Sequence, residues 1–167
     1  MNLLISACLL GLRCRYDGQA KPNPRLEEVN RRFTLLPVCP EVLGGLQTPR
    51  IPAERVGTRV MTEAGGDVTE AYWMGAEEAL RVARKTGCTL ALLKEKSPSC
   101  GSGAIYDGTF SRQLIPGDGV CAEMLKQNGI RVFGESEIDA LLKLADATED
   151  ETKDPFIKNE GGYRDEF

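Results

Sequence analysis

Three cysteines stand at, or shortly after, the ends of short apolar runs. Cys8 follows the run 2–7, Cys39 follows the run 34–38, and Cys100 lies a few residues beyond a third run. Runs of this length, bounded by Gly, Pro and Ser, are typical of buried strands. The carboxyl ends of parallel strands share one edge of an open sheet, and ligands bind at that edge. We therefore expect the three thiols to converge at one point.

Three thiolates at one place carry three negative charges, which a bound cation has to neutralise. The separations, 31 residues from Cys8 to Cys39 and 61 from Cys39 to Cys100, differ from the close cysteine pairs of structural zinc sites. No Cys-x-x-Cys redox motif is present. An iron–sulfur cluster fits better, although a zinc site and a redox thiol remain alternatives. Three ligands on a four-iron cluster leave one iron open as a Lewis acid, like the vacant position of a catalytic zinc.

The three remaining cysteines are interpreted differently. Cys14 is the only other thiol whose loop position suits a fourth ligand, and a fourth thiolate would make the site an electron carrier. Cys88 and Cys121 are predicted to be buried apolar thiols, remote from the others. A secreted disulfide framework is disfavoured because the chain is larger and more regularly patterned than small stapled scaffolds.

Composition narrows the possible functions. The chain has no histidine, so acid–base chemistry must use other side chains. From residue 145 onward, eight acidic and three basic residues give a net charge of −5. The rest of the chain, with 18 basic and 17 acidic residues, is nearly neutral, which argues against a broad nucleic-acid-binding surface. No apolar run approaches the roughly 18 residues of a membrane helix. The first residues also lack the basic start of a signal peptide, so we expect a cytoplasmic protein; its oligomeric state stays open.

The order of the predicted elements indicates an α/β fold, namely a three-layer Rossmann-like domain with a central, mostly parallel sheet. We expect a single domain over residues 1–144. The acidic C-terminal tail, 145–167, is interpreted as a mobile or lightly docked segment. The predicted strands are 3–7, 34–38, 89–93 and 130–133, and the predicted helices are 23–32, 70–85, 119–127 and 136–144.

Local features between these elements can also be predicted. The segment 55–68, with β-prone pieces around 65–67, indicates a small hairpin, and 101–119 is expected to be a glycine-rich loop. Thr69 and Asp118 are in position to cap the helices that follow them. Trp73 falls on the apolar face of its helix, which favours a core anchor over a ligand contact.

Five blocks of sequence carry a family resemblance: SACLLG (6–11), RYDG (15–18), CPEVLGGL (39–46), TPR (48–50) and KEKSPSCG (94–101). Together they resemble the thiouracil desulfidase family, long known only as a domain of unknown function, over residues 1 to about 143. The resemblance implies an oxygen-sensitive 4Fe-4S cluster held by Cys8, Cys39 and Cys100, with Cys14 outside the ligand set. It also implies replacement of the sulfur of a thiolated pyrimidine by oxygen, but it does not transfer the identity of the substrate.

Three residues in these blocks are candidates for catalysis. Glu41, two residues beyond a predicted ligand, is the candidate general base that would activate water. The alternative role of its carboxylate is an N-cap or a salt bridge with Arg50. Ser97 and Ser99 are candidates to hydrogen-bond substrate or a cluster sulfur, and capping of their turn is the alternative.

Asp17, Arg50 and Lys94 are the candidate substrate-binding residues, although exposed charges are mostly solvated. The predicted function is an iron–sulfur-dependent desulfidase that works without net redox change on a thiolated pyrimidine or a related thiocarbonyl compound. The expected partner is this small thiolated molecule, with no membrane. A non-enzymatic iron–sulfur sensor or cluster-binding protein is the alternative, and a zinc-dependent hydrolase is a more distant one.

Overall fold

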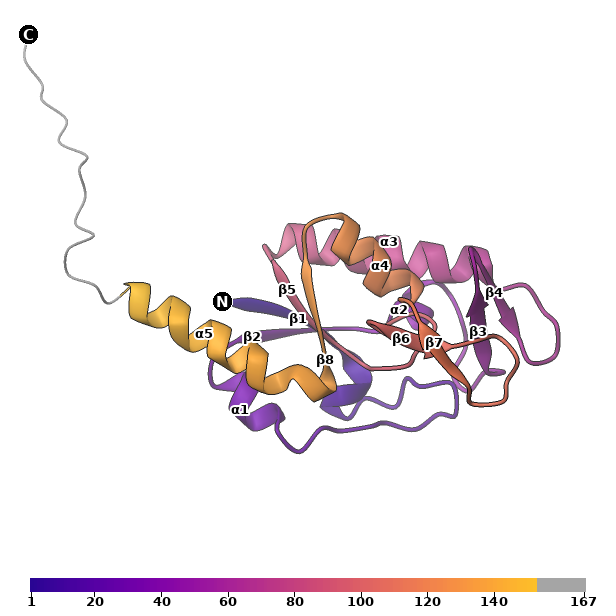
Figure 1. Ribbon diagram of the computed structural model, residues 1–167, viewed down its shortest axis with the longest axis horizontal. Helices are drawn as coiled ribbons and strands as arrows, with labels where there is room; N and C mark the ends of the chain where they lie inside the picture. The colour runs from indigo at the N-terminus through magenta and orange to yellow at the C-terminus, as the bar shows by residue number, and fades with distance from the viewer. Residues whose placement is uncertain (153–167) are drawn as a thin grey trace, which may run out of the picture.

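The centre of the fold is a four-stranded parallel sheet. Its strands are β1 (Asn2–Ser6), β2 (Thr34–Val38), β5 (Leu90–Leu93) and β8 (Arg131–Gly134). Figure 1 shows them in the computed structural model, which describes residues 1–152. The strands lie in the order β2-β1-β5-β8, so the order reverses between β1 and β5. As an edge strand, β2 accommodates Pro37, which has no amide proton to donate to a neighbour.

The strands bury apolar side chains on both faces of the sheet. In β1, Leu3 and Ile5 point to one face and Leu4 points to the other, and none of the three is exposed. In β5, Leu92 and Ala91 divide between the faces in the same way. Because successive side chains of a strand alternate, two separate cores form, one on each face.

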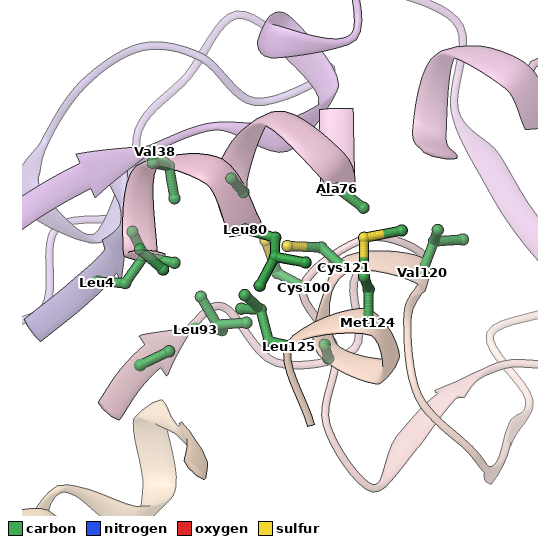
Figure 2. Packing of buried hydrophobic residues seen from close by; sticks show 14 of the residues in the cluster. Leu4, Val38, Ala76, Leu80, Leu93, Cys100, Val120, Cys121, Met124 and Leu125 are labelled. Atoms are coloured by element: carbon green, nitrogen blue, oxygen red, sulfur yellow. The ribbon is translucent and has the colours of Figure 1, made fainter. Parts of the chain in front are cut away.

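Helices cover both faces and complete three layers, as the sequence predicted (Figure 1). On one face lie α3 (Thr69–Lys85) and α4 (Val120–Gln127), and on the other lie α1 (Leu26–Asn30) and α5 (Ile138–Thr152). Figure 2 shows the first core, in which Leu4 and Leu93 of the sheet meet Leu80 of α3 and Leu125 of α4. Among the helices formed by residues 1–152, none combines the length and apolarity that a membrane crossing needs.

Two helices differ in length from the prediction. α1 is shorter than the expected 23–32, and α5 continues to Thr152 instead of ending near residue 144. Ala145 of α5 is buried in the second core, so the start of the predicted acidic tail belongs to a packed helix. Residues 153–167 lie outside the described part of the chain. Trp73 packs partly buried against the core, as predicted.

Two small antiparallel hairpins lie outside the central sheet. The first pairs β3 (Ala53–Val56) with β4 (Arg59–Thr62), and the second pairs β6 (Ala104–Tyr106) with β7 (Leu114–Pro116). The first hairpin overlaps the predicted region 55–68, but its strands are joined at Gly57, which has a positive φ of 61°, rather than at 65–67. The chain also reverses near the predicted position, where Met61 and Asp67 form an isolated antiparallel bridge. The stretch 101–119, expected to be a loop, contains the second hairpin. Strands of three residues are too short to show an alternating pattern.

The two predicted helix caps are also wrong. Thr69 is the first residue of α3, and its Oγ1 accepts a hydrogen bond from the Val60 amide at 2.9 Å. Asp67 fills the capping role instead, because its Oδ1 accepts a hydrogen bond from the Thr69 amide at 3.0 Å. Asp118 Oδ1 accepts hydrogen bonds from the Gly103 amide and from Lys126 Nζ, each at 2.8 Å. It thereby ties down the preceding loop and the side chain of α4 rather than the helix amides.

A short helix, α2 (Pro40–Leu43), begins directly after β2 and packs against α3. Pro40 is the first residue of α2, where a missing amide proton is harmless. The two backbones nearly touch: a Cβ added at Gly75 of α3 would lie 1.7 Å from the Pro40 carbonyl oxygen, and one added at Gly44 would lie 1.9 Å from the Ala71 carbonyl oxygen. Only glycine at these two positions allows this close approach.

The variant Gly75→Ala should therefore push α2 away from α3 and destabilise the fold. We expect a loss of about 1–3 kcal/mol in the free energy of unfolding, the usual range for overpacking. The measurement is urea-induced unfolding, with Met74→Ala on the half-exposed face of the same helix as control. The control should change stability by less than about 0.5 kcal/mol. Equal stability of Gly75→Ala and the parent protein would contradict the close backbone contact.

Candidate functional site

A cavity of about 460 Å³ lies at the carboxyl edge of the central sheet. The thiols of Cys8, Cys14, Cys39 and Cys100 line it. Cys8 follows β1, Cys39 follows β2 and Cys100 follows β5, which are adjacent strands. The structure thus confirms that the three predicted cysteines face one cavity. The cavity includes the point between β1 and β5 where the strand order reverses, which is the usual ligand site of open α/β sheets.

Each of the three cysteines is fixed by a different local structure. Cys8 lies in the 3-10 helix η1 (Ala7–Leu10) that directly continues β1. Cys39 is the N-cap residue of α2. Cys100 lies in the turn 97–101, where the Pro98 and Ser99 carbonyls accept hydrogen bonds from the first amides of α4 at 2.9–3.1 Å. These otherwise unpaired helix amides hold the turn against α4.

Two thiols of the cavity, Cys39 and Cys100, have pKa values raised well above the ordinary value of a cysteine. Burial raises the pKa of Cys100 to about 12. A hydrogen bond with Cys14, followed by burial, raises the pKa of Cys39 far above its ordinary value. Three neutral thiols can stay together without a partner, whereas three thiolates need a cation beside them. The site is therefore built either to remain protonated or to bind a positively charged group.

Hydroxyl groups surround Cys100. The Ser6 hydroxyl is buried, and its oxygen accepts a hydrogen bond from the Lys94 amide at 2.9 Å. Its hydrogen bond to the Cys100 sulfur favours the thiolate and partly offsets the effect of burial on the pKa of Cys100. Ser99 Oγ is buried without a good hydrogen-bond partner, and it also lies close enough to this thiol to lower its pKa. Such donors suit a metal-bound thiolate, whose sulfur accepts hydrogen bonds.

The predicted serines occupy different positions. Ser97 lines the cavity, and its Oγ accepts hydrogen bonds from the Ser99 and Cys100 amides, each at 3.1 Å. Its alternative role as a cap of the turn is confirmed. Ser99 is 1% exposed and does not line the cavity, so its hydroxyl is available to the Cys100 sulfur but not to a molecule in the cavity.

Glu41 lines the cavity from α2 and is held by two partners. Its Oε2 accepts a hydrogen bond from Arg50 Nη2 at 2.9 Å, which confirms the alternative of a salt bridge rather than an N-cap. Its Oε1 accepts a short hydrogen bond from the Tyr72 hydroxyl. Burial, followed by the charge of Glu41, raises the pKa of Tyr72 well above its ordinary value, so Tyr72 donates as a neutral phenol.

Sequence reasoning missed Tyr72 as part of the site. It belongs to the buried stripe of α3, together with Ala76, Ala79 and Ala83. The signal was present in the helical spacing of these residues, because the single large polar side chain of such a stripe needs a buried partner.

Of the three predicted substrate-binding residues, only Lys94 lines the cavity. Its Nζ lies 2.8 Å from Glu135 Oε1. Arg50 does not line the cavity but lies behind Glu41, where its Nη2 also donates to the Cys14 carbonyl at 2.7 Å. Asp17 does not line the cavity either; its carboxylate lies 3.9 Å from Arg15, which does.

Cys121 is buried, as predicted, but it is not remote from the site. Figure 2 shows it close to Cys100 in the core between the sheet and α4. Burial, followed by the charges of Cys100 and Cys39, raises the pKa of Cys121 well above its ordinary value. The prediction failed because α4 begins directly against the turn that carries Cys100. Cys88 precedes β5, at the strand end away from the cavity, as predicted.

Comparison with known proteins gives this cavity a context. A model of the 2-thiouracil desulfurase family matches residues 3–137. The chain belongs to this family. It is 42% identical over 150 residues to the uncharacterized protein YbbK of Bacillus subtilis (strain 168), an alignment that covers 84% of this chain and 99% of YbbK. It also resembles the solved structure of the 4Fe-4S-dependent thiouracil desulfidase TudS, with a TM-score of 0.82 and 46% identity over 88% of this chain and 98% of that one.

The donor set of the cavity suits a group larger than one metal ion. Within residues 1–152, no three Cys, Asp or Glu side chains are arranged to hold a single metal ion. A zinc ion binds sulfur at about 2.3 Å, so the ligands around it nearly touch. The cavity instead presents thiols from three strand ends, without histidine, and this is the donor set that iron–sulfur clusters use.

The salt bridge behind Glu41 leads to a stability prediction. The Arg50 and Glu41 side chains are only 8% and 16% exposed. The variant Arg50→Met should lower the free energy of unfolding by about 3 kcal/mol, because it leaves the Glu41 carboxylate and the Cys14 carbonyl short of a donor. The matched control is Arg31→Met, which breaks an exposed pair with Glu27 and should cost at most about 0.5 kcal/mol. Similar losses for both variants in urea unfolding would contradict a special role of the inner pair.

Proposed function

We propose that this chain is an iron–sulfur-dependent desulfidase that replaces the thiocarbonyl sulfur of a thiolated pyrimidine, or of a related compound, by oxygen. The observation that carries the proposal is one cavity lined by the thiols of Cys8, Cys39 and Cys100 together with the carboxylate of Glu41. Membership of the 2-thiouracil desulfurase family and the likeness to TudS support it. A cytoplasmic location remains a prediction.

Cys8, Cys39 and Cys100 would hold a 4Fe-4S cluster, and Cys14 would stay outside the ligand set. When bound, such a cluster supplies a soft Lewis-acidic iron, which suits the sulfur of a thiocarbonyl group. The Ser6 and Ser99 hydroxyls would then donate to the Cys100 thiolate, which explains why Ser99 Oγ is buried without another partner. In this assignment Ser99 acts on a ligand rather than on the substrate.

The reaction consumes one water molecule and gives the oxo base and hydrogen sulfide. One C=S bond is replaced by one C=O bond, and no electrons are gained or lost. Glu41 would accept the proton of the attacking water. Each carboxylate oxygen has two acceptor sites, so both oxygens can still accept a proton while Tyr72 and Arg50 each occupy one site.

The remaining polar residues have supporting roles in this proposal. The Ser97 oxygen accepts two amide hydrogen bonds, so its hydroxyl proton is left to orient the substrate. Lys94 contributes a positive charge at the cavity wall, shared with Glu135. Arg50 would act by orienting Glu41 rather than by touching substrate, since it does not line the cavity. Asp17 does not line the cavity, so it would influence the substrate only through Arg15, which lines the cavity and lies 3.9 Å from the Asp17 carboxylate.

One observation favours the alternative of a non-enzymatic iron–sulfur protein. The Cys14 thiol lines the cavity. A hydrogen bond with Cys39 lowers its pKa, but a hydrogen bond with Cys8 and partial burial raise it, so that the pKa of Cys14 lies above its ordinary value. A fourth thiolate from Cys14 would complete the coordination of a cluster and leave no position for a substrate. The two functions therefore differ in whether Cys14 is a ligand.

The ligand set can be tested by iron and sulfide quantitation after anaerobic purification. The variants Cys8→Ser, Cys39→Ser and Cys100→Ser should each lose most of the cluster, whereas Cys14→Ser should keep it. Cys121→Ala is the matched control, because this thiol lies near Cys100 but outside the cavity lining. Loss of iron in Cys14→Ser as complete as in Cys100→Ser would favour the sensor.

The activity is tested by anaerobic sulfide release from thiouracil and thiouridine. The cluster-loaded protein should produce sulfide and the oxo base in equal amounts without added reductant. General-base catalysis contributes typically ~100- to 10,000-fold, so Glu41→Gln should slow turnover by about that factor while keeping its iron. Absence of sulfide from both substrates would refute pyrimidine desulfidation. A fully active Glu41→Gln variant would refute the role of Glu41 as general base but not the desulfidase activity.

A further inference from the structure

The cavity has an aromatic residue that the desulfidation chemistry does not use. Phe110 lies in the loop between β6 and β7, residues 107–113, and lines the cavity. It is half-buried, yet it belongs to neither of the two hydrophobic cores formed by residues 1–152. Tyr106 at the end of β6 and Arg112 of the same loop also line the cavity. The loop of this hairpin therefore contributes Phe110 to the cavity wall rather than to either core.

The loop is held in place by a buried carboxylate. Glu54 of β3 is 7% exposed, and its Oε2 accepts hydrogen bonds from the Gly108 amide at 2.8 Å and from the Phe110 amide at 3.1 Å. Gly108 packs against the same strand so closely that a Cβ there would lie 2.2 Å from a methyl carbon of Val56. A buried carboxylate is costly unless it is hydrogen-bonded, and here loop amides supply the hydrogen bonds.

The backbone of the loop is strained at the residue that reaches the cavity. Phe110 has a φ of 57° and Arg112 a φ of 61°, in the left-handed region that side chains other than glycine, asparagine and aspartate rarely adopt. Such conformations persist only where the surroundings determine them, and they cluster at ligand-binding sites. For Phe110, the hydrogen bond from its amide to Glu54 supplies such surroundings, and the resulting conformation places Phe110 in the lining of the cavity.

We propose that Phe110 is a specificity-determining residue that stacks on the planar heteroaromatic ring of the substrate, and that Glu54 positions it. This inference rests on the proposed function. Aromatic rings pair favourably beyond simple apolar burial, and stacking on a base tolerates different ring substituents. The enzyme would thus select flat heterocyclic thiocarbonyls over acyclic ones.

The first test compares kinetics of cluster-loaded variants with thiouracil. Removal of a stacking side chain typically weakens base binding by about 5- to 100-fold, so Phe110→Ala should raise KM by that factor and should raise KM more than it lowers kcat. Phe110→Tyr keeps the ring and should retain most of the affinity, whereas Phe110→Leu, which is apolar but not aromatic, should resemble the alanine variant. Leu114→Ala, a half-exposed apolar residue of the same hairpin outside the cavity lining, should leave KM unchanged.

The role of Glu54 is tested with a conservative pair. Glu54→Gln retains a carbonyl oxygen that can accept both amide hydrogen bonds, so it should keep most of the affinity. Glu54→Ala leaves the two amides without their acceptor and should raise KM nearly as much as Phe110→Ala does. If both residues act through one contact, the double variant should be little worse than either single variant. Fully additive effects would refute positioning by Glu54.

A binding measurement separates this inference from the proposed function. Calorimetric titration of the cluster-loaded protein with uracil, the oxo product, reports ring binding without turnover. We expect binding to the parent protein that is weakened about 5- to 100-fold by Phe110→Ala. Equal affinity of the parent and Phe110→Ala, or no uracil binding at millimolar concentration, would overturn the stacking proposal. Uracil binding without any sulfide release from thiouracil would instead refute only the desulfidase function.

Discussion

The parallel pairing of β2, β1 and β5 is the constraint on which the rest of the site depends. It brings to one edge three cysteines that are 31 and 61 residues apart in the chain. Two of these thiols are buried and Cys39 is half-buried, and the surroundings of Cys39 and Cys100 disfavour their thiolates, because both pKa values are raised. A bound cationic group would reverse this balance, because it converts the mutual repulsion of three thiolates into attraction. The fold thus brings three cysteines to one point, where a positively charged group would stabilise their thiolate forms.

The layers around the sheet hold this edge rigid in two ways. On one side, the amides at the start of α4 bind the turn that carries Cys100, and the Ser6 and Ser99 hydroxyls surround its sulfur. On the other side, α2 can lie on α3 only because Gly44 and Gly75 have no side chains. This contact brings Glu41 to Tyr72. Backbone packing that looks purely structural therefore sets the orientation of the carboxylate that faces the cavity.

In the proposed function, the two small hairpins contribute to substrate choice. The β3–β4 hairpin supplies Glu54, and the β6–β7 hairpin supplies Phe110, so a contact between hairpins shapes the wall of the cavity. The thiols and Glu41 come instead from the ends of the central strands and from α2. In the proposed function, chemistry and ring recognition therefore reside on different elements. Changes in the hairpins could alter the substrate without disturbing the ligands.

The three-layer α/β fold and the shared edge of Cys8, Cys39 and Cys100 could be predicted from the amino-acid sequence, because buried parallel strands leave continuous apolar runs and the cysteines follow the ends of these runs. The sequence also indicated the candidate base Glu41 and its possible partner Arg50. Three contacts became visible only in the folded chain: Tyr72 binds Glu41, Cys121 lies beside Cys100, and Glu54 holds the loop of Phe110. These contacts join residues 21–56 positions apart on elements whose relative placement depends on packing. Local periodicity reports which face of an element is buried, but not which distant side chain it meets there.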